Sequence, residues 1–462
     1  MSPLEHSQKH LHAIGIGGIG VSALARHFLA KGWKVSGCDV SSSVLFHKGE
    51  VLVGHDASHI DHFHPDMIVY SPAVPEDHPE LLRASEEKIP LYSYPEALGF
   101  LATEIDTIAV SGTHGKSTTT ALLARMFAEG KKDPVAIVGA RVPAQGFEEN
   151  YRKGTGGYFI VEACEYRRGM LEIHPKSVII TNIEADHLDY YKDLSDVTQA
   201  FVQYAKGLPP DGVLVYNAED EQATSVSHES KARTVSFGFT KGDIQAKDIV
   251  EKGGDMTARI ILRGEELGTL TTPLMGSFNM MNILAATSMA IAYGIGFEDI
   301  TRAVKDFQGI GRRFEHLGEI SGTPVYSDYA HHPTALRLAH EAAEAKFGIG
   351  NVLAVFQPHQ IDRTKKLRQD FESVFRTIPH LYLPEIYFVP GREHAGGFSA
   401  KLLADEVNVG RLDPIRFFGT LEEMTDDIIH DAKKWKVVLF IGAGDIDRYA
   451  RTLLRRSALE GI

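Results

Sequence analysis

The chain has 462 residues, of which 43% are hydrophobic and 24% are charged, and its formal net charge is −13. This length suits two or three domains, and the composition is that of a soluble globular protein. The acidic balance argues against nucleic acid or an anionic membrane as the main partner, because phosphate groups bind basic surfaces.

The two cysteines, Cys38 and Cys164, lie far apart in the sequence, so neither a disulfide framework nor a zinc motif can be built from their spacing. Residues 1–10 are polar and lack the apolar core of a signal peptide. No apolar run approaches the ~20 residues of a membrane helix. We therefore expect a cytoplasmic protein without membrane insertion, and either a monomer or a weak homodimer.

The first predicted elements form a nucleotide-binding pattern. Residues 12–29 read as a strand, a Gly-x-Gly-x-x-Gly turn and a helix, and a second strand over residues 33–38 ends at Asp39. In this layout a diphosphate binds at the helix N-terminus and the acid bonds a ribose hydroxyl. The pattern indicates a nucleotide diphosphate without saying which nucleotide. A tight turn that binds no ligand is the alternative.

The same domain continues with a strand that ends in a proline-rich turn, over residues 66–75. This turn, which begins at Ser71, falls at the carboxyl edge where open α/β sheets bind ligands. Strands and helices alternate to about residue 105, which predicts one small doubly wound domain.

A phosphate-binding loop opens the next domain. Residues 108–127 predict a strand, a loop and a helix, and the loop reads Ser-Gly-Thr-His-Gly-Lys-Ser-Thr-Thr from position 111. Backbone N–H groups and the helix dipole hold an anion in such loops. Lys116 would reach the terminal phosphates of a nucleoside triphosphate, and the Ser117 hydroxyl would bind Mg²⁺. Because the loop is shorter than the usual pattern after Gly112, a plain glycine-rich turn is the alternative.

Two further apolar strands, within residues 158–165 and 177–189, end in acidic residues or histidine. Strand ends of this kind, placed beside a phosphate loop, build magnesium–nucleotide sites. The acids at these strand ends are candidate ligands, together with His187. For His187 a structural hydrogen bond is the alternative.

Residues 210–275 contain short alternating strands and predict a β-rich insert or a sheet edge. A helix begins within residues 276–287, and we expect its methionines to pack in the core. Asn279 and Asn282, near the start of this helix, are placed to reach an adenine ring.

A boundary is expected at Gly309-Ile310-Gly311, where glycines would form a hinge. Arg312 and Arg313 follow and suit a charge clamp on phosphate, with a solvated basic patch as the alternative. Beyond them we expect a third domain with strands within residues 324–333, 351–359, 385–390 and 437–445.

Taken in order, these motifs resemble those of the Mur ligase family over almost the whole chain. The motifs that carry the resemblance are Gly15-Ile16-Gly17-Gly18-Ile19-Gly20, Ser71-Pro72-Ala73-Val74, Gly112-Thr113-His114-Gly115-Lys116, Glu162-Ala163-Cys164-Glu165-Tyr166-Arg167, Asn182-Ile183-Glu184-Ala185-Asp186-His187, Asp328-Tyr329-Ala330-His331-His332-Pro333, Phe356-Gln357-Pro358-His359 and Gly442-Ala443-Gly444-Asp445.

The resemblance implies an α/β protein of three domains. Residues 1–105 would form a Rossmann-like domain that binds a UDP-sugar. Residues 106–310 would form a P-loop ATPase-like domain with a mostly parallel sheet, and residues 311–462 a Rossmann-like domain that closes over ATP and the amino acid.

The resemblance also implies an activity, an ATP-dependent ligation of L-alanine to the carboxylate of UDP-N-acetylmuramic acid through an acyl phosphate, in peptidoglycan precursor synthesis. ATP and Mg²⁺ would be its cofactors. The motifs at Phe356–His359 and Gly442–Asp445 favour this activity over that of the tripeptide-adding recycling ligase, which is the first alternative. A nicotinamide-dependent oxidoreductase is the second alternative, and it would leave the phosphate loop unexplained.

The resemblance implies the following site residues. Catalytic roles fall to Lys116, Glu162, His187, His331 and Arg363. ATP would be bound by Gly112, Thr113, His114, Gly115, Lys116, Ser117, Thr118, Asn279, Asn282, Arg313 and Asp328. The substrates would be bound by Gly17, Gly18, Ile19, Asp39, Ser71, His114 and His359. The metal ligands would be Ser117, Glu162 and His187. The sequence departs from the family at Gln360, where a second arginine is common, and in a short segment after Asp39.

Overall fold

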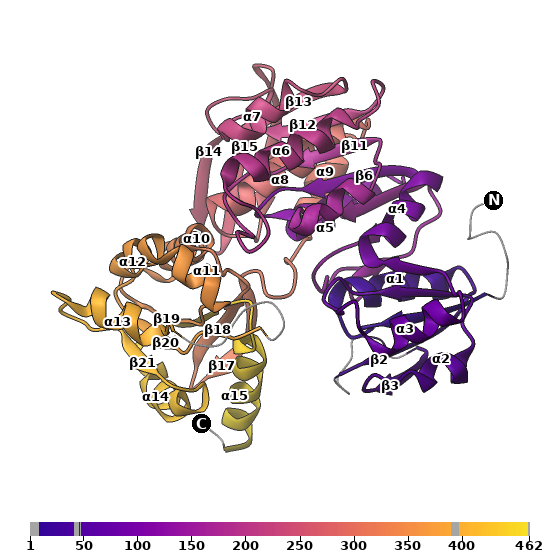
Figure 1. Ribbon diagram of the computed structural model, residues 1–462. Coiled ribbons are helices and arrows are strands. Elements are labelled where there is room, and N and C mark those ends of the chain that lie inside the picture. The colour runs from indigo at the N-terminus through magenta and orange to yellow at the C-terminus, as the bar shows by residue number, and fades with distance from the viewer. Residues whose placement is uncertain (1–8, 41–45, 47, 390–396, 461–462) are drawn as a thin grey trace.

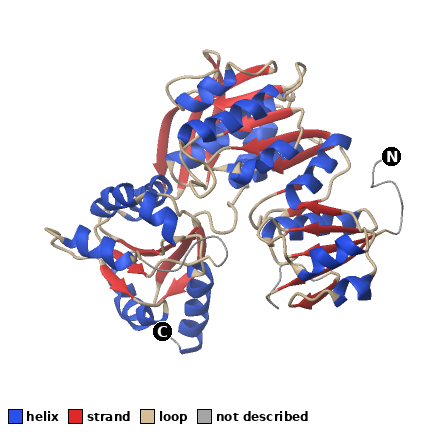
Figure 2. Ribbon diagram, in the orientation of Figure 1, coloured by secondary structure: helices blue, strands red, loops and turns tan. Residues whose placement is uncertain are grey.

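The computed structural model describes residues 9–40, 46, 48–389 and 397–460. The chain forms three α/β domains, each built on its own sheet (Figures 1 and 2). In Figure 1 the N-terminal domain (indigo) and the C-terminal domain (orange to yellow) both lie beside the central domain (magenta). No helix in the described part of the chain is long and apolar enough to cross a membrane.

The N-terminal domain has, in its described residues, a parallel five-stranded sheet in the order β3-β2-β1-β4-β5. The strands are β1 (His10–Ile14), β2 (Lys34–Asp39), β3 (Glu50–Val53), β4 (Met67–Tyr70) and β5 (Leu91–Ser93). The helices are α1 (Ile19–Ala30), α2 (Ser58–Phe63), α3 (Pro79–Glu86) and α4 (Tyr94–Glu104). The strand order reverses beside β1, so the glycine turn after β1 lies at the switch point where open sheets bind ligands.

The central domain holds an eleven-stranded sheet in the order β16-β15-β14-β13-β12-β11-β6-β10-β7-β9-β8, counted over the described residues. Its strands are β6 (Asp106–Ser111), β7 (Val135–Ile137), β8 (Phe147–Glu148), β9 (Tyr151–Arg152), β10 (Tyr158–Glu162), β11 (Ser177–Ile180), β12 (Val213–Asn217), β13 (Arg233–Gly238), β14 (Ile244–Lys252), β15 (Asp255–Leu262) and β16 (Glu265–Thr272). Its helices are α5 (Lys116–Glu129), η1 (Tyr166–Glu172), α6 (Leu194–Lys206), α7 (Glu221–Ser227), α8 (Ser277–Ala292) and α9 (Phe297–Lys305).

The middle of this sheet is parallel, and its two edges are antiparallel. β12 to β16 extend one edge, which confirms the sheet-edge prediction for residues 210–275. Met280 on α8 is fully buried in the core, as predicted for the methionines of this helix.

The C-terminal domain carries a sheet in the order β17-β18-β22-β19-β20-β21, in which only the β17–β18 pair is antiparallel among the described strands. Its strands are β17 (Glu315–Ile320), β18 (Thr323–Asp328), β19 (Val352–Phe356), β20 (Leu381–Pro384), β21 (Arg416–Phe418) and β22 (Val437–Ile441). Its helices are α10 (Pro333–Phe347), α11 (Ile361–Lys366), α12 (Arg368–Thr377), α13 (Ala400–Asn408), η2 (Glu422–Met424), α14 (Thr425–Asp431), η3 (Ala432–Lys434) and α15 (Ile446–Glu460).

One predicted strand is wrong. Residues 385–389 follow β20 as a loop with a single bridge at Tyr387, and Pro390 lies outside the described residues. The strand is the preceding segment, β20, which is fully buried. Glu385 instead turns its carboxylate to the start of α13, where Ser399 Oγ and Ala400 N donate to it at 2.6 and 2.8 Å.

The N-terminal and central domains share one hydrophobic cluster, which joins Leu11 and Leu98 to Val161 and Ile180. α4 lies between the two domains and packs against η1 and β6 (Figure 1). The N-terminal nucleotide pattern is thereby held against the central sheet.

Candidate active site

The phosphate loop lies at the carboxyl end of β6, directly before α5. β6 is buried along most of its length, which fixes where the loop emerges. Gly112 and Gly115 have φ values of 131° and 83°, in the range that favours glycine. A Cβ atom at Gly112 would collide with Thr181 Oγ1, and one at Gly115 would collide with Asn282 Oδ1. The loop is therefore clamped between the end of β11 and the start of α8.

Lys116 is almost buried and forms an ion pair with Glu165, at 2.9 Å between Nζ and Oε2. Nζ also donates to the Gly112 and Thr113 carbonyls at 2.6 and 3.1 Å. Burial opposes the charge on Nζ, but the neighbouring acidic groups, Glu165 foremost, together outweigh burial and raise the pKa of Lys116. Lys116 is thus held as a cation beside the loop.

Ser117 begins the first turn of α5 and donates from Oγ to Glu162 Oε2 at 2.8 Å. Glu162 is the last residue of β10, and Gly139 N donates to the same oxygen at 2.9 Å. The hydroxyl and the carboxylate predicted as magnesium ligands therefore meet at the loop.

His187 follows β11 and lies near Glu165 rather than in contact with Glu162. Its Nε2 is 3.7 Å from Glu165 Oε1, and the described residues include no hydrogen bond or ion pair between His187 and Glu162. Ligand atoms of Cys164, Glu165 and His187 lie within 4.8 Å of one another. Glu165 was not singled out from the sequence, although a second acid after the same strand was a usable signal.

The C-terminal domain reaches the site through Arg363, on α11. Arg363 Nη2 lies 3.1 Å from Asp186 Oδ1, and His331 Nε2 lies 4.0 Å from Asp186 Oδ2. Burial alone would favour the neutral acid, but Arg363 and His187 hold the pKa of Asp186 well below its usual range. Asp186 is thus a central-domain anion that binds the C-terminal domain.

A second contact joins the two domains at Glu184. Thr334 Oγ1 donates to Glu184 Oε2 at 3.0 Å. The same oxygen lies 3.6 Å from His114 Nε2 and 3.7 Å from His332 Nδ1. His114, in the phosphate loop, therefore faces the C-terminal domain through this carboxylate. Neither Glu184 nor Asp186 was singled out from the sequence, because partners of both residues lie in a different domain.

Arg312 and Arg313, the two arginines after the expected hinge, both lie over the Tyr329 ring, and their role as a clamp on phosphate stays a prediction. Arg312 Nη2 donates to the Gly442 and Gly444 carbonyls at 2.6 and 3.1 Å. Burial lowers the pKa of Arg312, which argues against the solvated basic patch at this residue. Arg313 lies over the Tyr329 ring, 5.1 Å from its centroid.

Asp328 and His359, two further predicted residues, lie on the C-terminal side of the site. Asp328 ends β18 and accepts hydrogen bonds from Phe314 N and Ala330 N, each at 2.8 Å. Burial raises the pKa of Asp328. His359 stacks on Tyr387 and lies 3.4 Å from Arg363 Nη1 through Nδ1.

Asn279 and Asn282, on the first turns of α8, are both buried. Asn282 Oδ1 accepts from Thr119 Oγ1 at 3.4 Å, and Asn279 Nδ2 donates to the Met275 carbonyl at 2.8 Å. Asn282 lies against Gly115 of the phosphate loop, and its Nδ2 donates to Asn279 Oδ1 at 3.5 Å.

The N-terminal site residues surround the turn after β1. Gly17 N donates to Asp39 Oδ2 at 2.9 Å, so one oxygen of the predicted ribose acid holds the turn itself. Gly18 precedes α1, and Ile19 is its first residue. Ser71 N donates to the Ile14 carbonyl at 3.1 Å, which places Ser71 beside the same turn.

Three of the non-glycine residues with left-handed backbone lie around the interdomain site. His187, Arg312 and Gln360 have φ values of 53°, 57° and 68°. Such conformations cost about 1–3 kcal/mol each and cluster at functional sites. At Gln360 the strained residue stands directly before α11, which carries Arg363.

Three family models cover most of the chain. Residues 10–105 match the model described as "Mur ligase family, catalytic domain", residues 110–290 match "Mur ligase middle domain", and residues 312–444 match "Mur ligase, glutamate ligase domain". The UDP-N-acetylmuramate–L-alanine ligase of Clostridium novyi is 36% identical over 457 residues, and the alignment covers 98% of each chain.

The chain belongs to the Mur ligase family. The corresponding ligase of Clostridium tetani is 37% identical over 446 residues, covering 95% of this chain and 96% of that protein. The crystal structure of UDP-N-acetylmuramate–alanine ligase from Thermotoga maritima matches with a TM-score of 0.81 at 27% identity, covering 98% of this chain and 100% of the other. These findings confirm the family resemblance and the three-domain Mur ligase fold predicted from the sequence.

Proposed function

We propose that this Mur ligase joins L-alanine to the carboxylate of UDP-N-acetylmuramic acid, with ATP as the energy source. The observation that carries this proposal is the full-length similarity to relatives that bear that activity in their names, at 36 and 37% identity. The phosphate loop supports it, because Lys116 is paired with Glu165 there and the Asp186–Arg363 ion pair joins the central domain to the C-terminal domain. We place the reaction in the cytoplasm. For the oligomeric state, we predict a monomer or a weak homodimer.

The chemistry requires activation of the carboxylate. A carboxylate does not react with an amine at neutral pH, because its oxygen is a poor leaving group. Transfer of the γ-phosphoryl group of ATP gives an acyl phosphate and ADP. The alanine amine then attacks the carbonyl carbon, and phosphate leaves from the tetrahedral intermediate.

Lys116 is the residue we assign to the phosphoryl group. The first step brings two anions together, and a fixed cation offsets their repulsion without reorganisation. The loop amides and the α5 N-terminus, which includes Ser117 and Thr118, would add partial positive charge. The Glu165 ion pair keeps Lys116 charged and directed at the loop before ATP arrives.

Magnesium fits the residues at the loop. Ser117 Oγ and Glu162 Oε2 are hard oxygen donors that already lie 2.8 Å apart, and Mg²⁺ prefers such ligands together with phosphate oxygens. His187 would complete the protein side of the metal site. A bound Mg²⁺ would supply charge stabilisation to the transferring phosphoryl group.

The C-terminal domain would cover the reaction. Arg363 and His331 already contact the central domain at Asp186, and both face the region beside His187. Burial lowers the pKa of His331 well below its usual value, so its imidazole is neutral at pH 7. We assign His331 to this site as a neutral hydrogen-bonding group, because a lowered pKa makes an imidazole a weaker base for the alanine ammonium. We assign adenine contacts to Asn279 and Asn282, and further ATP and substrate contacts to Arg313, Asp328 and His359.

The direct test measures product formation with each acceptor. The protein is mixed with Mg-ATP and UDP-N-acetylmuramic acid, with L-alanine, L-serine, glycine or the recycling tripeptide, and products are identified by mass. Phosphate release that needs the sugar nucleotide and L-alanine, with the alanyl product, is expected. Product from the tripeptide alone would identify a recycling ligase instead, and no product from any acceptor would reject the ligase assignment.

A further inference from the structure

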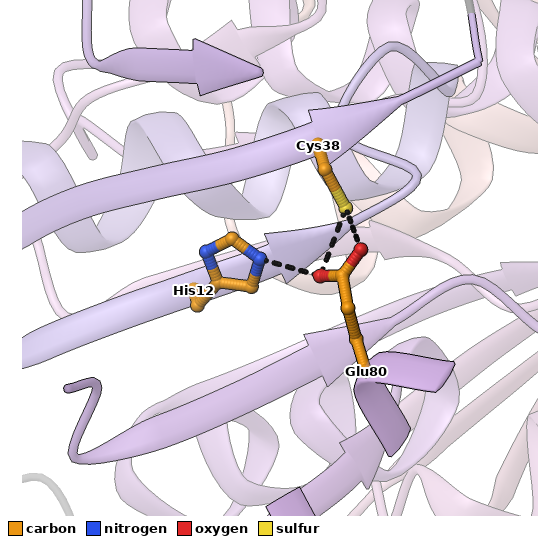
Figure 3. A group of neighbouring side chains, drawn as sticks. All are labelled: His12, Cys38 and Glu80. Carbon is orange, nitrogen blue, oxygen red and sulfur yellow. Dashed lines mark hydrogen bonds and ion pairs between the residues drawn. The ribbon is translucent and has the colours of Figure 1, made fainter. Parts of the chain in front are cut away.

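A carboxylate in the N-terminal domain lies at the centre of a histidine-rich cluster outside the ligase site. Glu80, on α3, is fully buried. His12 Nε2 lies 2.9 Å from Oε2, and Cys38 Sγ lies 3.1 Å from Oε1 and 3.2 Å from Oε2. Figure 3 shows Cys38 and His12, from two neighbouring strands, pointing at this carboxylate.

Three histidines contact Glu80, and among the described residues no lysine or arginine does. Besides His12, the rings of His55 and His59 approach Oε1 through Nδ1 at 3.3 and 3.2 Å. A buried carboxylate without a permanent cation is costly, so it is paired or it coordinates a metal. Imidazole, thiol and carboxylate are also the ligand types of zinc sites.

His78 provides an independent observation. Its side chain is buried, with 6% of the residue exposed, and neither ring nitrogen has a hydrogen-bond partner. Its ring packs edge-on against His55, with centroids 4.4 Å apart. Ligand atoms of His55, His78 and Glu80 lie within 4.8 Å of one another. The His78 imidazole is therefore buried, has no hydrogen-bond partner and lies within reach of the Glu80 cluster.

We propose that Cys38, His55, His78 and Glu80 form a tetrahedral binding site for one zinc-class divalent cation. Zinc bonds of about 2.0–2.3 Å place tetrahedral ligand atoms roughly 3.3–3.7 Å apart. Cys38 Sγ lies 3.2 Å from His55 Nδ1 and 3.1 Å from Glu80 Oε1, so these three ligand atoms are already close to this geometry. His78, which is grouped with His55 and Glu80, would turn toward them to complete it. His55 is partly exposed and provides a route from solvent.

The surrounding residues support Glu80 as a ligand. His12 holds Oε2, which leaves Oε1 toward Cys38 and His55. His12 Nδ1 in turn lies 2.9 Å from Ser36 Oγ, which lies 2.8 Å from His10 Nε2. A chain of hydrogen bonds of this kind fixes the orientation of a metal ligand.

The charges of the site match a divalent cation. Burial and the Glu80 carboxylate raise the pKa of the Cys38 thiol, so without a cation Cys38 is protonated. When the cation binds, the Cys38 S–H bond breaks, a sulfur–metal bond forms, and the proton goes to solvent. One thiolate and one carboxylate then balance the two positive charges. The spacing of the cysteines alone predicted no zinc motif, because three of the four ligands are not cysteines.

A cation bound at this site would also affect the nucleotide-binding turn. The Cys38 carbonyl accepts hydrogen bonds from Gly15 N and Ile16 N, at 2.9 and 3.1 Å. A cation on Cys38 Sγ would fix the residue that anchors this turn. We therefore expect the cation to stabilise the N-terminal domain, at a distance from the phosphate loop and without a part in phosphoryl transfer.

Cobalt is the probe that tests the site, because a cobalt–thiolate bond has its own near-ultraviolet absorption. Untagged, chelator-treated full-length protein is titrated with Co²⁺ while absorbance, proton release and thermal unfolding are followed. We expect one tight equivalent per chain, a thiolate band, about one proton released from Cys38 and a higher unfolding midpoint. Zn²⁺ should remove the band by competition.

The second cysteine provides a matched control. Cys164→Ser should keep the thiolate band, and Cys38→Ser should lose it. His78→Ala should weaken Co²⁺ binding at least tenfold, whereas His62→Ala, on the exposed side of α2, should leave binding unchanged. Wild-type protein without a thiolate band, or a band lost in Cys164→Ser and kept in Cys38→Ser, would overturn the proposal. Because the wild-type titration needs no variant, misfolding of a variant cannot obscure the result.

Discussion

At the scale of single residues, the site depends on buried charges that have specific partners. Lys116 is held by Glu165, which has 2% of its side chain exposed. Removing one partner of a buried ion pair leaves the other uncompensated, and it costs about 3–5 kcal/mol. The pair therefore has two roles, one in the stability of the central domain and one in positioning the cation for phosphate.

Replacing Lys116 should affect activity and stability together. We expect Lys116→Ala to lower kcat about 10²–10³-fold, because a preorganised charge at the phosphoryl group is lost. Phosphate release and urea unfolding measure the two effects. Lys206→Ala, which removes an exposed lysine paired with Glu229, is the control and should change neither. Wild-type turnover by Lys116→Ala would contradict the phosphate-loop assignment.

The sequence predicted Lys116 and missed Glu165, for a physical reason. The lysine belongs to a local pattern whose spacing fixes its place at the start of a helix. Its partner comes from a different strand end, and only the packing of β10 beside β6 brings the two together. The same holds for Arg363 and Asp186, which belong to different domains.

A buried histidine links stability to pH. His27, on α1, is buried within 3.5 Å of the Tyr151 hydroxyl of the central domain, and burial lowers its pKa to about 4. Its folded pKa is below its unfolded value, so its stabilising contribution is complete above pH 6.5 and is lost as pH falls toward 4. The lost contribution is about 3 kcal/mol.

The variant His27→Gln tests this effect. Its free energy of unfolding should fall less steeply than that of the wild type between pH 6.5 and pH 4. Urea unfolding at several pH values measures both slopes. Parallel profiles for the two proteins would show that His27 titrates normally in the folded state.

At the scale of elements, α4 and η1 hold the N-terminal domain against the central domain. Gly99, within α4, lies against the carbonyl of Glu172, the last residue of η1, and a Cβ atom there would collide with that oxygen. In an unconstrained helix a glycine is about 1 kcal/mol less favourable than alanine. Here close packing reverses the preference.

We therefore expect Gly99→Ala to destabilise the protein by about 1–3 kcal/mol, as overpacking does in tight interfaces. Thr103→Ala, at an exposed position of the same helix, is the control and should stay within about 0.5 kcal/mol of the wild type. Thermal and urea unfolding measure both. A stabilised Gly99→Ala would mean that the two helices separate readily.

The elements themselves were largely predictable, because buried strands followed by glycine turns have strong local signals. The glycine turns after β1 and β6 fell where the pattern placed them. The failure at residues 385–389 came from an apolar run that sits beside the true strand, β20. Periodicity cannot separate two adjacent apolar segments, and only pairing with β19 and β21 decides.

At the scale of the whole molecule, charged contacts hold the C-terminal domain on the central domain. Asp186 and Arg363 form the central contact, and Lys366 Nζ donates to the Leu188 carbonyl at 2.6 Å nearby. These contacts are mainly polar, with Leu188 packed against the C-terminal core, and polar interfaces are typical of domains that move relative to one another. The hinge at Gly309 and Gly311 stays a prediction.

Neutralising Asp186 should open the molecule. We expect Asp186→Asn without ligands to have a larger radius of gyration than the wild type, because Arg363 loses its buried anionic partner. Small-angle X-ray scattering measures the change. Asp370→Asn, which removes an exposed carboxylate from α12, should leave the radius unchanged. An unchanged radius in Asp186→Asn would show that other contacts are sufficient for closure.

The most direct test of carboxylate activation follows one oxygen atom of the substrate. UDP-N-acetylmuramic acid with ¹⁸O in its carboxylate is converted with Mg-ATP and L-alanine, and the released phosphate is examined by mass spectrometry. Activation through an acyl phosphate predicts one ¹⁸O atom in the phosphate for each amide bond formed. Phosphate without ¹⁸O, alongside normal product formation, would contradict carboxylate activation at the phosphate loop.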